Sequence, residues 1–354
     1  MATIDRFFKV LKEKGGSDLH ILAGQPPKFR IHGRLEPLNM PPLSNREAMD
    51  LLYEIVDKRK KERFEKHLDL DFAYEVPGVA RFRCNFLHHQ HGVGAVFRII
   101  PTDIKSIEDL GVPLVLKRFC YLRSGLVLVT GPTGSGKSTT LAAMINEINR
   151  EESKHIITIE DPIEFVHENK TSVITQREVG NDSESFSTAL KAATREDPDV
   201  VLVGEMRDLE TIGLAISSAE MGQLVFGTLH TNNAAKTIDR IIDVFPEESQ
   251  EQIRTMLSVS LVGVCSQLLL RKTDGQGRVP VNEILMGSPG LANIIREGNI
   301  HKISTYIESG RGEGMQLMDD SIMERLKAGL VSPNEAYMKA IDKSRFEHLY
   351  KKTQ

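Results

Sequence analysis

Residues 126–140, LVLVTGPTGSGKSTT, decide how this chain folds. Residues 126–129 form a short apolar run typical of a buried β-strand, a turn rich in glycine follows, and residues 139–144 have the composition of a helix. The turn fits the pattern G-x-x-x-x-G-K-[ST] at Gly131, Gly136, Lys137 and Ser138. A strand, loop and helix of this kind bind phosphate, because the glycines let backbone N–H groups curl around phosphate oxygens at a helix N-terminus.

The loop residues have separate tasks toward a nucleoside triphosphate. The residues that we expect to contact the nucleotide are Gly131, Pro132, Thr133, Gly134, Ser135, Gly136, Lys137, Ser138 and Thr139. Lys137 neutralises the β- and γ-phosphates, and the Ser138 hydroxyl ligates Mg²⁺. ATP and Mg²⁺ are therefore the predicted cofactors, and a plain glycine turn is the alternative.

The composition is that of an ordinary soluble protein. The 354 residues are enough for about two domains, each with its own core. Because 45 Lys and Arg residues oppose 49 Asp and Glu residues, the net charge is −4, and no global positive field attracts nucleic acid or anionic lipid. The three cysteines form no C-x-x-C pair, which argues for a reducing compartment and against structural zinc. No signal peptide or membrane span is evident, so we expect a cytoplasmic protein.

Residues 1–98 are predicted to form a small α+β domain. Apolar spacing indicates a helix over residues 4–11, and Ser44 with Glu47 has capping-box spacing at the start of a second helix. Apolar residues alternate along 68–74 and again along 80–86, which predicts an antiparallel hairpin. The polar and glycine-containing segment 99–112 is interpreted as a linker.

From residue 113 to 290, apolar strands alternate with helical stretches, which predicts an α/β domain with a mostly parallel sheet. The strand candidates are residues 126–129, 156–159, 200–203, 224–226 and 268–270. Residues 291–354 are predicted to be a helical tail. In its last helix, Ser332 is the N-cap, Pro333 the first helical residue and Glu335 the residue at N3.

Polar residues follow four of these strands, at the points where ligands bind in open α/β sheets. The first is the phosphate loop; Glu160, Glu205 and His230 follow the others. Phosphoryl transfer needs metal, positioning and charge neutralisation, so Glu205 is our candidate for a Mg²⁺ ligand or a base that orients water. Glu160 is a second candidate Mg²⁺ ligand, and we expect His230 to sense the γ-phosphate.

Several of these residues also have structural interpretations. Glu160 and Asp161 could cap the segment that follows them, and His230 could be an ordinary loop histidine. Arg207 is expected to pair with Asp208 or a neighbouring carboxylate rather than with nucleotide. A solvated loop explains His88, His89 and His91 better than a metal site, since no carboxylate or cysteine partner is near them in sequence.

Nothing beside the loop supplies an arginine to stabilise the transition state. The candidates are Arg81 and Arg83 on one face of the predicted hairpin, with Arg98 close in sequence. In a ring of subunits they could reach a neighbour's nucleotide. A solvated polar face is the alternative.

Four motifs, in this order, carry a resemblance: GPTGSGKST, IEDPIE, VGEMRD and FGTLHTNNAAKTIDRI. They resemble the Walker A, Asp box, Walker B and His box of the PilT family, the type IV pilus retraction ATPases within the secretion-ATPase superfamily. GGSDLHILAGQPPKFRIHG resembles that family's PAS-like N-terminal domain, and LANIIREG resembles its C-terminal AIRNLIRE motif. The resemblance thus covers nearly the whole chain.

The resemblance implies a RecA-like P-loop ATPase core and a ring-shaped homo-hexamer. It further implies a cytoplasmic motor that associates with the inner membrane through a pilus platform protein, acts indirectly on the pilin filament to retract it, and can work beside a retraction paralogue. The residues that carry over are Lys137, Ser138, Glu160, Glu205 and His230. No nucleic acid and no zinc are expected.

Two departures from the family pattern keep alternatives open. Gln223 stands where the family usually has a histidine, and Ala292 replaces the arginine of the C-terminal motif. An accessory retraction paralogue is therefore one alternative, and an assembly ATPase for pilus extension or type II secretion is another, although the tetracysteine module of those enzymes is missing. A RecA-like helicase is disfavoured, because the chain has no tryptophan and no long basic run.

Overall fold

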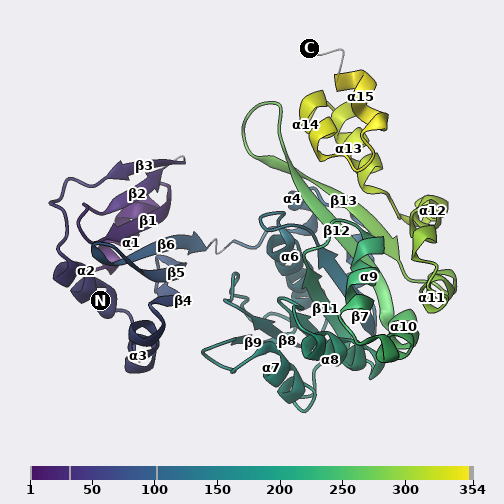
Figure 1. Cartoon of the computed structure of the whole chain (residues 1–354), viewed down its shortest axis with the longest axis horizontal. Helices are drawn as coiled ribbons and strands as arrows, with labels where there is room; N and C mark the ends of the chain where they lie inside the picture. The colour runs from purple at the N-terminus through teal and green to yellow at the C-terminus, as the bar shows by residue number, and fades with distance from the viewer. Residues whose placement is uncertain (1, 32, 101–102, 351–354) are drawn as a thin grey trace. The chain divides into compact units, whose positions relative to one another are not determined.

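The computed structural model describes residues 2–31, 33–100 and 103–350 (Figure 1). They form two compact units. The first unit comprises Met1–Asp103 together with Pro162–Val166, and the second comprises Ile104–Asp161 together with His167–Gln354. Among the described residues, no helix combines the length and the apolar character that crossing a bilayer requires.

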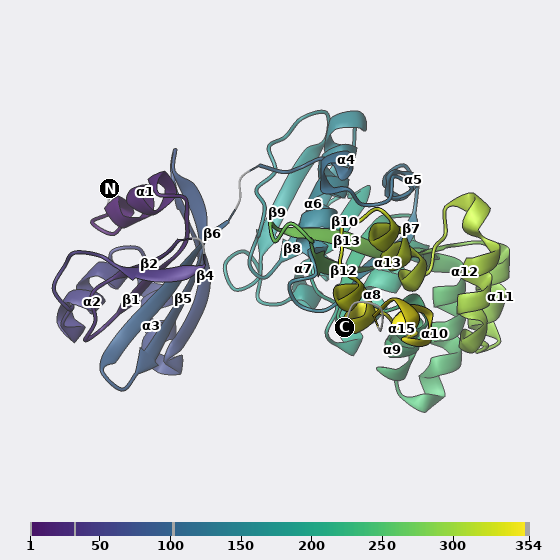
Figure 2. The same ribbon diagram turned by 90° about the horizontal axis from the view of Figure 1, so that it is seen from above.

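The first unit is built on an antiparallel sheet with the order β3-β2-β1-β6-β5-β4. Its strands are β1 (Gly16–Leu22), β2 (Lys28–Ile31), β3 (Arg34–Pro37), β4 (Asp69–Val76), β5 (Ala80–His89) and β6 (Gly92–Ile100). Its helices are α1 (Asp5–Glu13), α2 (Asn45–Tyr53) and α3 (Lys58–His67), and α1 and α2 lie on the same side of the sheet (Figure 2). The hairpin β4–β5 and the capping box of Ser44 with Glu47 are as predicted.

Aromatic side chains fill the space between these helices and the sheet. Phe8 of α1 stacks on Phe82 with ring centroids 4.1 Å apart and meets Phe97 edge to face at 5.1 Å. Phe64 of α3 meets Phe86 in the same edge-to-face manner. Since alternate residues of a strand point to opposite faces, the neighbouring Arg81, Arg83 and Arg98 lie on the face away from the helices.

The second unit is built on a sheet with the order β13-β12-β7-β11-β10-β8-β9. Its strands are β7 (Gly125–Thr130), β8 (His155–Glu160), β9 (Val173–Glu178), β10 (Val200–Val203), β11 (Leu224–Leu229), β12 (Leu261–Arg271) and β13 (Arg278–Met286). Every neighbouring pair is parallel except β12–β13, so the predicted mostly parallel sheet is confirmed. The five strand candidates from the sequence fall inside β7, β8, β10, β11 and β12.

Helices cover this sheet and form the C-terminal region. They are α4 (Ile107–Leu110), α5 (Leu116–Cys120), α6 (Lys137–Glu151), α7 (Phe186–Ala193), α8 (Leu209–Glu220), α9 (Ala234–Asp243), α10 (Glu247–Ser260), α11 (Pro289–Arg296), α12 (Ile303–Ser309), α13 (Met318–Lys327), α14 (Pro333–Lys339) and α15 (Ser344–Tyr350), with short 3₁₀ turns at Ile300–Lys302 and Arg311–Glu313. The last three helices, α13, α14 and α15, gather in one group (Figure 1). Ser332 caps α14 by accepting a hydrogen bond from the Glu335 N–H at 3.2 Å, as predicted.

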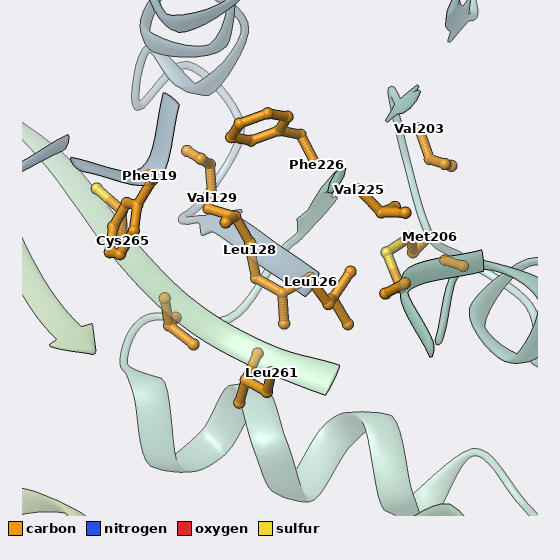
Figure 3. Packing of buried hydrophobic residues seen from close by; sticks show 14 of the residues in the cluster. Phe119, Leu126, Leu128, Val129, Val203, Met206, Val225, Phe226, Leu261 and Cys265 are labelled. Carbon is orange, nitrogen blue, oxygen red and sulfur yellow. The ribbon is translucent and has the colours of Figure 1, made fainter. Parts of the chain in front are cut away.

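The core of the second unit surrounds β7, all of whose residues are buried. This explains why the strand reads as one apolar run rather than an alternating one, since both faces of a central parallel strand are covered. Figure 3 shows Leu126, Leu128 and Val129 of this strand among side chains from β11, β12 and α5.

The predicted linker, residues 99–112, contains more structure than its composition indicates. Ile100 ends β6, and Ser106 caps the single turn of α4 by accepting from the Asp109 N–H at 3.1 Å. Ile107 and Val112 are buried in the core of the second unit. Residues 101 and 102 lie outside the described residues. A short capped helix escapes detection because one turn carries too few residues to show a period.

Candidate active site

The phosphate loop follows β7 and leads directly into α6, as predicted. Gly131 has φ 145° and Gly136 has φ 85°, values that side chains with a Cβ rarely adopt. A Cβ at Gly131 would also overlap the backbone carbonyl of Gln267 on β12. Glycine is therefore required at Gly131 for two independent reasons. Because α6 begins at Lys137, its free N–H groups and positive dipole end lie at the end of the loop.

The Lys137 ammonium group is held against the loop. Its Nζ donates to the carbonyl oxygens of Gly131, at 2.8 Å, and Pro132, at 3.2 Å. These contacts place the positive charge over the turn that would surround the phosphates. Ser138, in the first turn of α6, is half-buried.

Four strands bring the predicted site residues to one edge of the sheet. In the sheet, β7 neighbours β11, β11 neighbours β10, and β10 neighbours β8, all parallel. Their carboxyl ends therefore meet: the loop follows β7, His230 follows β11, Glu205 lies just beyond β10, and Glu160 is the last residue of β8. The close packing is seen at Gly204, where a Cβ would lie 3.7 Å from Cγ of Glu160.

Glu205 is the centre of a charged cluster. Arg207 donates to both of its carboxylate oxygens, from Nε to Oε1 at 2.6 Å and from Nη2 to Oε2 at 2.6 Å. The Nε2 atom of His230 lies 2.9 Å from Oε1 of the same carboxylate. The structure thus brings together Glu205 and His230, which the sequence separates by 25 positions.

The charges around Glu205 set its ionisation. Partial burial raises the pKa of this carboxyl group, but the hydrogen bond and charge of Arg207, with the contribution of His230, outweigh burial and lower the pKa below its usual value. In turn, the hydrogen bond to Glu205 raises the pKa of the Arg207 guanidinium. Glu205 is therefore an anion at neutral pH.

A buried methionine fixes the backbone between Glu205 and Arg207. The side chain of Met206 is in the core, near Val225 in Figure 3, and its N–H donates to the carbonyl of Thr228 at 3.0 Å. Gly227 on β11 leaves the room that this side chain occupies, because a Cβ there would overlap the Met206 sulfur. The two charged neighbours consequently point out of the core together.

Glu160 has polar partners of its own. Its Oε1 accepts from Thr158 Oγ1 at 2.8 Å and from Gln176 Nε2 at 3.2 Å. It ends β8 and is half-buried, so its carboxylate is held in place by the neighbouring strand β9.

The donors at this edge suit Mg²⁺. Ser138, Glu160 and Glu205 supply hydroxyl and carboxylate oxygens, the hard ligands that Mg²⁺ prefers. Among the residues that the structure describes, no three His, Cys, Asp or Glu side chains converge on one point to hold a metal ion. Mg²⁺ is usually bound by one or two carboxylates together with water and substrate phosphates.

Asp161 and Arg207 differ in how their surroundings compare with the structural interpretations made from the sequence. No helix follows Asp161, because the next element is β9, so helix capping by this residue is wrong. Arg207 pairs with a carboxylate, as expected, but the partner is Glu205 and not Asp208, which instead caps α8 by accepting from the Thr211 N–H at 2.8 Å. Because Asp208 caps α8, its carboxylate is directed toward that helix, and Arg207 pairs with Glu205 near the end of β10.

The three candidate arginines lie in the first unit. Arg83 of β5 stands directly opposite Arg98 of β6 in the sheet register, so the two share one face. The Nε atom of Arg98 lies 2.8 Å from Oδ1 of the buried Asp18. Arg81 lies 3.7 Å from Glu75, a separate ion pair of the same unit. The three arginines therefore lie on one face of the sheet of the first unit, where Arg81 and Arg98 each pair with a carboxylate and Arg83 faces Arg98.

Sequence reasoning missed a cavity of about 640 Å³ beside the phosphate loop. Its walls include Leu110, Gly136, Thr139, Leu269, Arg278 and Arg325. Arg278 also donates from Nη1 to the Gly134 carbonyl of the loop at 3.2 Å. No motif could reveal this cavity, because its walls come from α4, α6, the β12–β13 hairpin and the C-terminal region, far apart in sequence.

The chain is similar to known proteins over most of its length. The family model described as "Type II/IV secretion system protein" matches residues 2–283. The chain is 51% identical to the "Type IV pilus retractation ATPase PilT" of Pseudomonas aeruginosa, over 93% of this chain and 95% of that protein. It is 50% identical to the "Twitching motility protein" of Neisseria gonorrhoeae, over 89% of this chain and 84% of that protein.

A solved structure is similar over almost the entire fold. The "Crystal Structure of the Pilus Retraction Motor PilT and Bound ADP" superposes with a TM-score of 0.91 at 43% identity, covering 98% of this chain and 99% of that chain. The fold class predicted from the sequence and the resemblance to the PilT family are thereby confirmed. The chain belongs to the Type II/IV secretion system protein family.

Proposed function

We propose that this protein is a hexameric ATPase motor that hydrolyses ATP to drive type IV pilus retraction, and with it twitching motility. The observation that carries the proposal is the arrangement of Glu205, His230 and the phosphate loop at one edge of a parallel sheet. The likeness to the PilT proteins, over more than nine-tenths of the chain for one of them, supports the direction of the work.

In this proposal the loop binds the triphosphate and Lys137 exchanges partners. The ammonium group leaves the carbonyls of Gly131 and Pro132 for the β- and γ-phosphates, whose charge attracts it more strongly. Ser138, Glu160 and Glu205 are the side chains that would hold Mg²⁺, directly or through water. When bound, Mg²⁺ neutralises charge that develops on the phosphate oxygens.

Glu205 is the proposed residue that orients the attacking water. Its lowered pKa keeps it ionised as a hydrogen-bond acceptor, and His230 next to it is placed to report the γ-phosphate. Arg207 holds both carboxylate oxygens, so the carboxylate must share or release this partner when it accepts a proton from water.

The cavity beside Gly136 and Thr139 is the proposed site of the ribose and base. It adjoins the start of α6, and its volume of about 640 Å³ falls in the usual range for sites of small ligands. Arg278 and Arg325 offer donors to the ribose or base, and Leu269 offers an apolar contact to the base.

The hexamer gives the three arginines of the first unit a proposed task. An arginine that stabilises the transition state raises the rate by about 10³–10⁵, or about 4–7 kcal/mol. We assign this role to Arg81, Arg83 or Arg98 acting on the nucleotide of an adjacent subunit. ATP binding and hydrolysis would then move the two units relative to each other about the segment between them.

The proposed partners follow from this role. The motor would contact the platform protein of the pilus at the inner membrane from the cytoplasmic side and act on the pilin filament indirectly. A retraction paralogue could share the task. Neither nucleic acid nor zinc has a place in the mechanism.

Deletion of the gene followed by complementation tests the direction of work. Cells without the protein should carry excess pili that do not retract, and plasmid-borne protein should restore retraction, whereas the Lys137→Ala variant should not. Bald cells would instead assign the protein to pilus extension, and an unchanged phenotype with low purified ATPase activity would favour an accessory role.

The accessory role remains the second candidate because of Gln223 and Ala292. The structure limits the weight of the first departure: Gln223 precedes β11 and His230 follows it, so they lie at opposite ends of a six-residue strand, about 20 Å apart. Ala292 lies in α11, whereas Glu205 follows β10, so the second departure is also in a different element and far from Glu205 in the sequence. ATP turnover by the purified protein alone separates a self-sufficient motor from an accessory one.

A mixing experiment tests the shared site. Subunits with Glu205→Ala are combined with subunits carrying Arg81→Ala and Arg83→Ala, and ATP turnover is measured. Partial recovery is expected, because some interfaces then pair an intact Glu205 with intact arginines. Mixtures that stay as inactive as either parent would argue against sites shared between subunits.

A further inference from the structure

A polar pair lies inside the apolar strand β12, where nothing in the motifs explains it. Ser266 and Gln267 are both buried, at 0% and 2% exposure. A buried amide costs free energy unless its donor and acceptor atoms are satisfied, so its partners show what the residue is for.

The Gln267 side chain joins the phosphate loop to two other elements. Its Nε2 donates to the carbonyl oxygen of Ser135, in the loop, at 2.7 Å. Its Oε1 accepts from Oγ1 of Thr140, in α6, at 2.9 Å and from Nδ2 of Asn282, in β13, at 3.0 Å. One amide thus fixes the loop, the helix behind it and the neighbouring strand.

The contact with Ser135 has a consequence for phosphate binding. A trans peptide unit directs its C=O and its N–H in opposite directions. Since the Ser135 carbonyl is fixed toward β12, the N–H of Gly136 in the same peptide unit points away from β12. Backbone N–H groups of such loops are the donors that bind phosphate, so this orientation matters directly for the ligand.

We propose that Gln267 is a positioning residue for the nucleotide phosphates: its amide holds the Ser135–Gly136 peptide with the N–H turned toward the ligand. This proposal rests on nucleotide binding at the phosphate loop. Gly136 has positive φ and little intrinsic preference for one orientation, so an external anchor is needed to fix the peptide. Thr140 and Asn282 hold the anchor itself in one rotamer.

The same network extends to the C-terminal helices. The backbone N–H of Asn282 donates to Oγ of Ser321, in α13, at 3.1 Å, and its carbonyl accepts from Nε2 of Gln316 at 2.8 Å. A continuous series of hydrogen bonds therefore links the loop peptide to α13, through Gln267 and Asn282.

The test compares Gln267→Met with a matched control on the same strand. The hydroxyl of Ser266 makes a buried hydrogen bond of 2.8 Å to Thr130, not to the loop peptide, so Ser266→Ala removes a buried hydrogen bond one residue away. For the full-length protein, calorimetry gives the Kd of ADP, competition against ADP gives that of adenosine, and thermal unfolding without nucleotide gives Tm.

Gln267 also lines the cavity beside the loop, so Gln267→Met should weaken ADP binding about tenfold and adenosine binding by a clearly smaller factor, and it should lower Tm no more than about twice as much as Ser266→Ala does. The Ser266→Ala protein should bind ADP as the wild type does. Equal ADP affinity in the two variants overturns the proposal, and so does an equal loss for ADP and adenosine.

A milder variant covers the case in which Gln267→Met does not fold. Thr140→Val keeps the shape of that side chain and removes one of the bonds that hold the Gln267 amide, so ADP binding should weaken about threefold and adenosine binding, whose proposed cavity Thr140 also lines, by a smaller factor. Unchanged ADP affinity would contradict the proposal. Lys137→Ala separates this outcome from failure of the proposed function: if that variant still binds ADP as the wild type does, the loop is not the nucleotide site at all.

Discussion

Each unit of the molecule contains a carboxylate held by two basic side chains, but in different settings. In the first unit, Asp18 lies within β1, with Arg98 Nε at 2.8 Å and Arg30 Nε at 3.6 Å, and its side chain is 4% exposed. In the second unit, Glu205 follows β10, with Arg207 and His230 as partners, and its side chain is 20% exposed.

The difference lies in the backbone that supports each carboxylate. Asp18 lies on β1 between two neighbouring strands, with Arg30 of β2 opposite it on one side and Arg98 of β6 opposite it on the other. The sheet register therefore fixes the positions of all three residues. Glu205 and its partners follow strand ends, where the backbone is held at fewer points. The same arrangement of charges therefore serves stability in the sheet and leaves room for chemistry at the strand end.

The largest predicted effect separates chemistry from stability. Glu205→Gln removes the anion that we propose to orient water, so kcat for ATP should fall by about 10²–10⁴ while ADP binding and Tm stay near those of the wild type. Steady-state turnover, calorimetry and thermal unfolding measure the three quantities. A variant with normal turnover would contradict the assignment of Glu205.

The corresponding change in the other carboxylate should act on stability. Asp18→Asn leaves the two arginines without their buried anion, and we expect a loss of about 1–3 kcal/mol in the free energy of unfolding of the first unit, measured in urea. Burial raises the pKa of Asp18, but the hydrogen bonds from Ser17 and Arg98 and the charges of both arginines lower it overall.

The sign of the pH dependence follows from that lowered pKa. The stabilising contribution of Asp18 is fully present above the pKa of the unfolded chain, about 3.9, and is lost as the pH falls through the lower folded value. The wild type should therefore lose this part of its stability in acid below pH 4, and Asp18→Asn should not. If the free energy of unfolding fell with pH by the same amount in both proteins below pH 4, the role of Asp18 would be contradicted.

A smaller effect concerns the pH profile of the second unit. Arg207→Gln removes the main group that lowers the pKa of Glu205, so that pKa should rise. The acid limb of kcat/KM should then move to higher pH. Arg207→Lys, which keeps the charge, should shift it less. An unmoved limb would show that Arg207 does not set the ionisation that matters for turnover.

The smallest effect tests whether both partners of Asp18 are needed. Arg30 is farther from the carboxylate than Arg98 and is partly exposed to solvent, so Arg30→Gln should cost less than about 1 kcal/mol. Urea unfolding of this variant beside Asp18→Asn measures it. A loss as large as that of Asp18→Asn would make Arg30 the principal partner.

The sequence alone could place the main site because parallel strands end at one edge. The apolar runs before Glu160, Glu205 and His230 belong to buried central strands, and their order of neighbours in the sheet brings the polar residues together. The two strands of this sheet that have no such run, β9 and β13, were not predicted from the sequence. The strand β9 lies at the sheet edge and has half-buried residues along most of its length, and β13 includes Pro280, Asn282 and Glu283.

Contacts between side chains were the other part that the sequence could not supply. Arg207 has acidic residues at positions 205 and 208, and only the backbone directions after β10 decide between them. Gln267 stands just before the strand candidate 268–270, and its partner in the loop is 132 positions away. Such long-range pairings depend on the three-dimensional arrangement of strands rather than on any local pattern.

Gly227 shows how a position with no chemistry of its own can influence the candidate active site. A single methyl group there would overlap the sulfur of Met206, so this side chain must shift, and the backbone that it anchors carries Glu205 and Arg207 on either side. In a mutant library, Gly227→Ala should therefore express well and yet score as a loss of function. A screen that reads only abundance would pass over it, and one that reads turnover would rank it with the charged residues themselves.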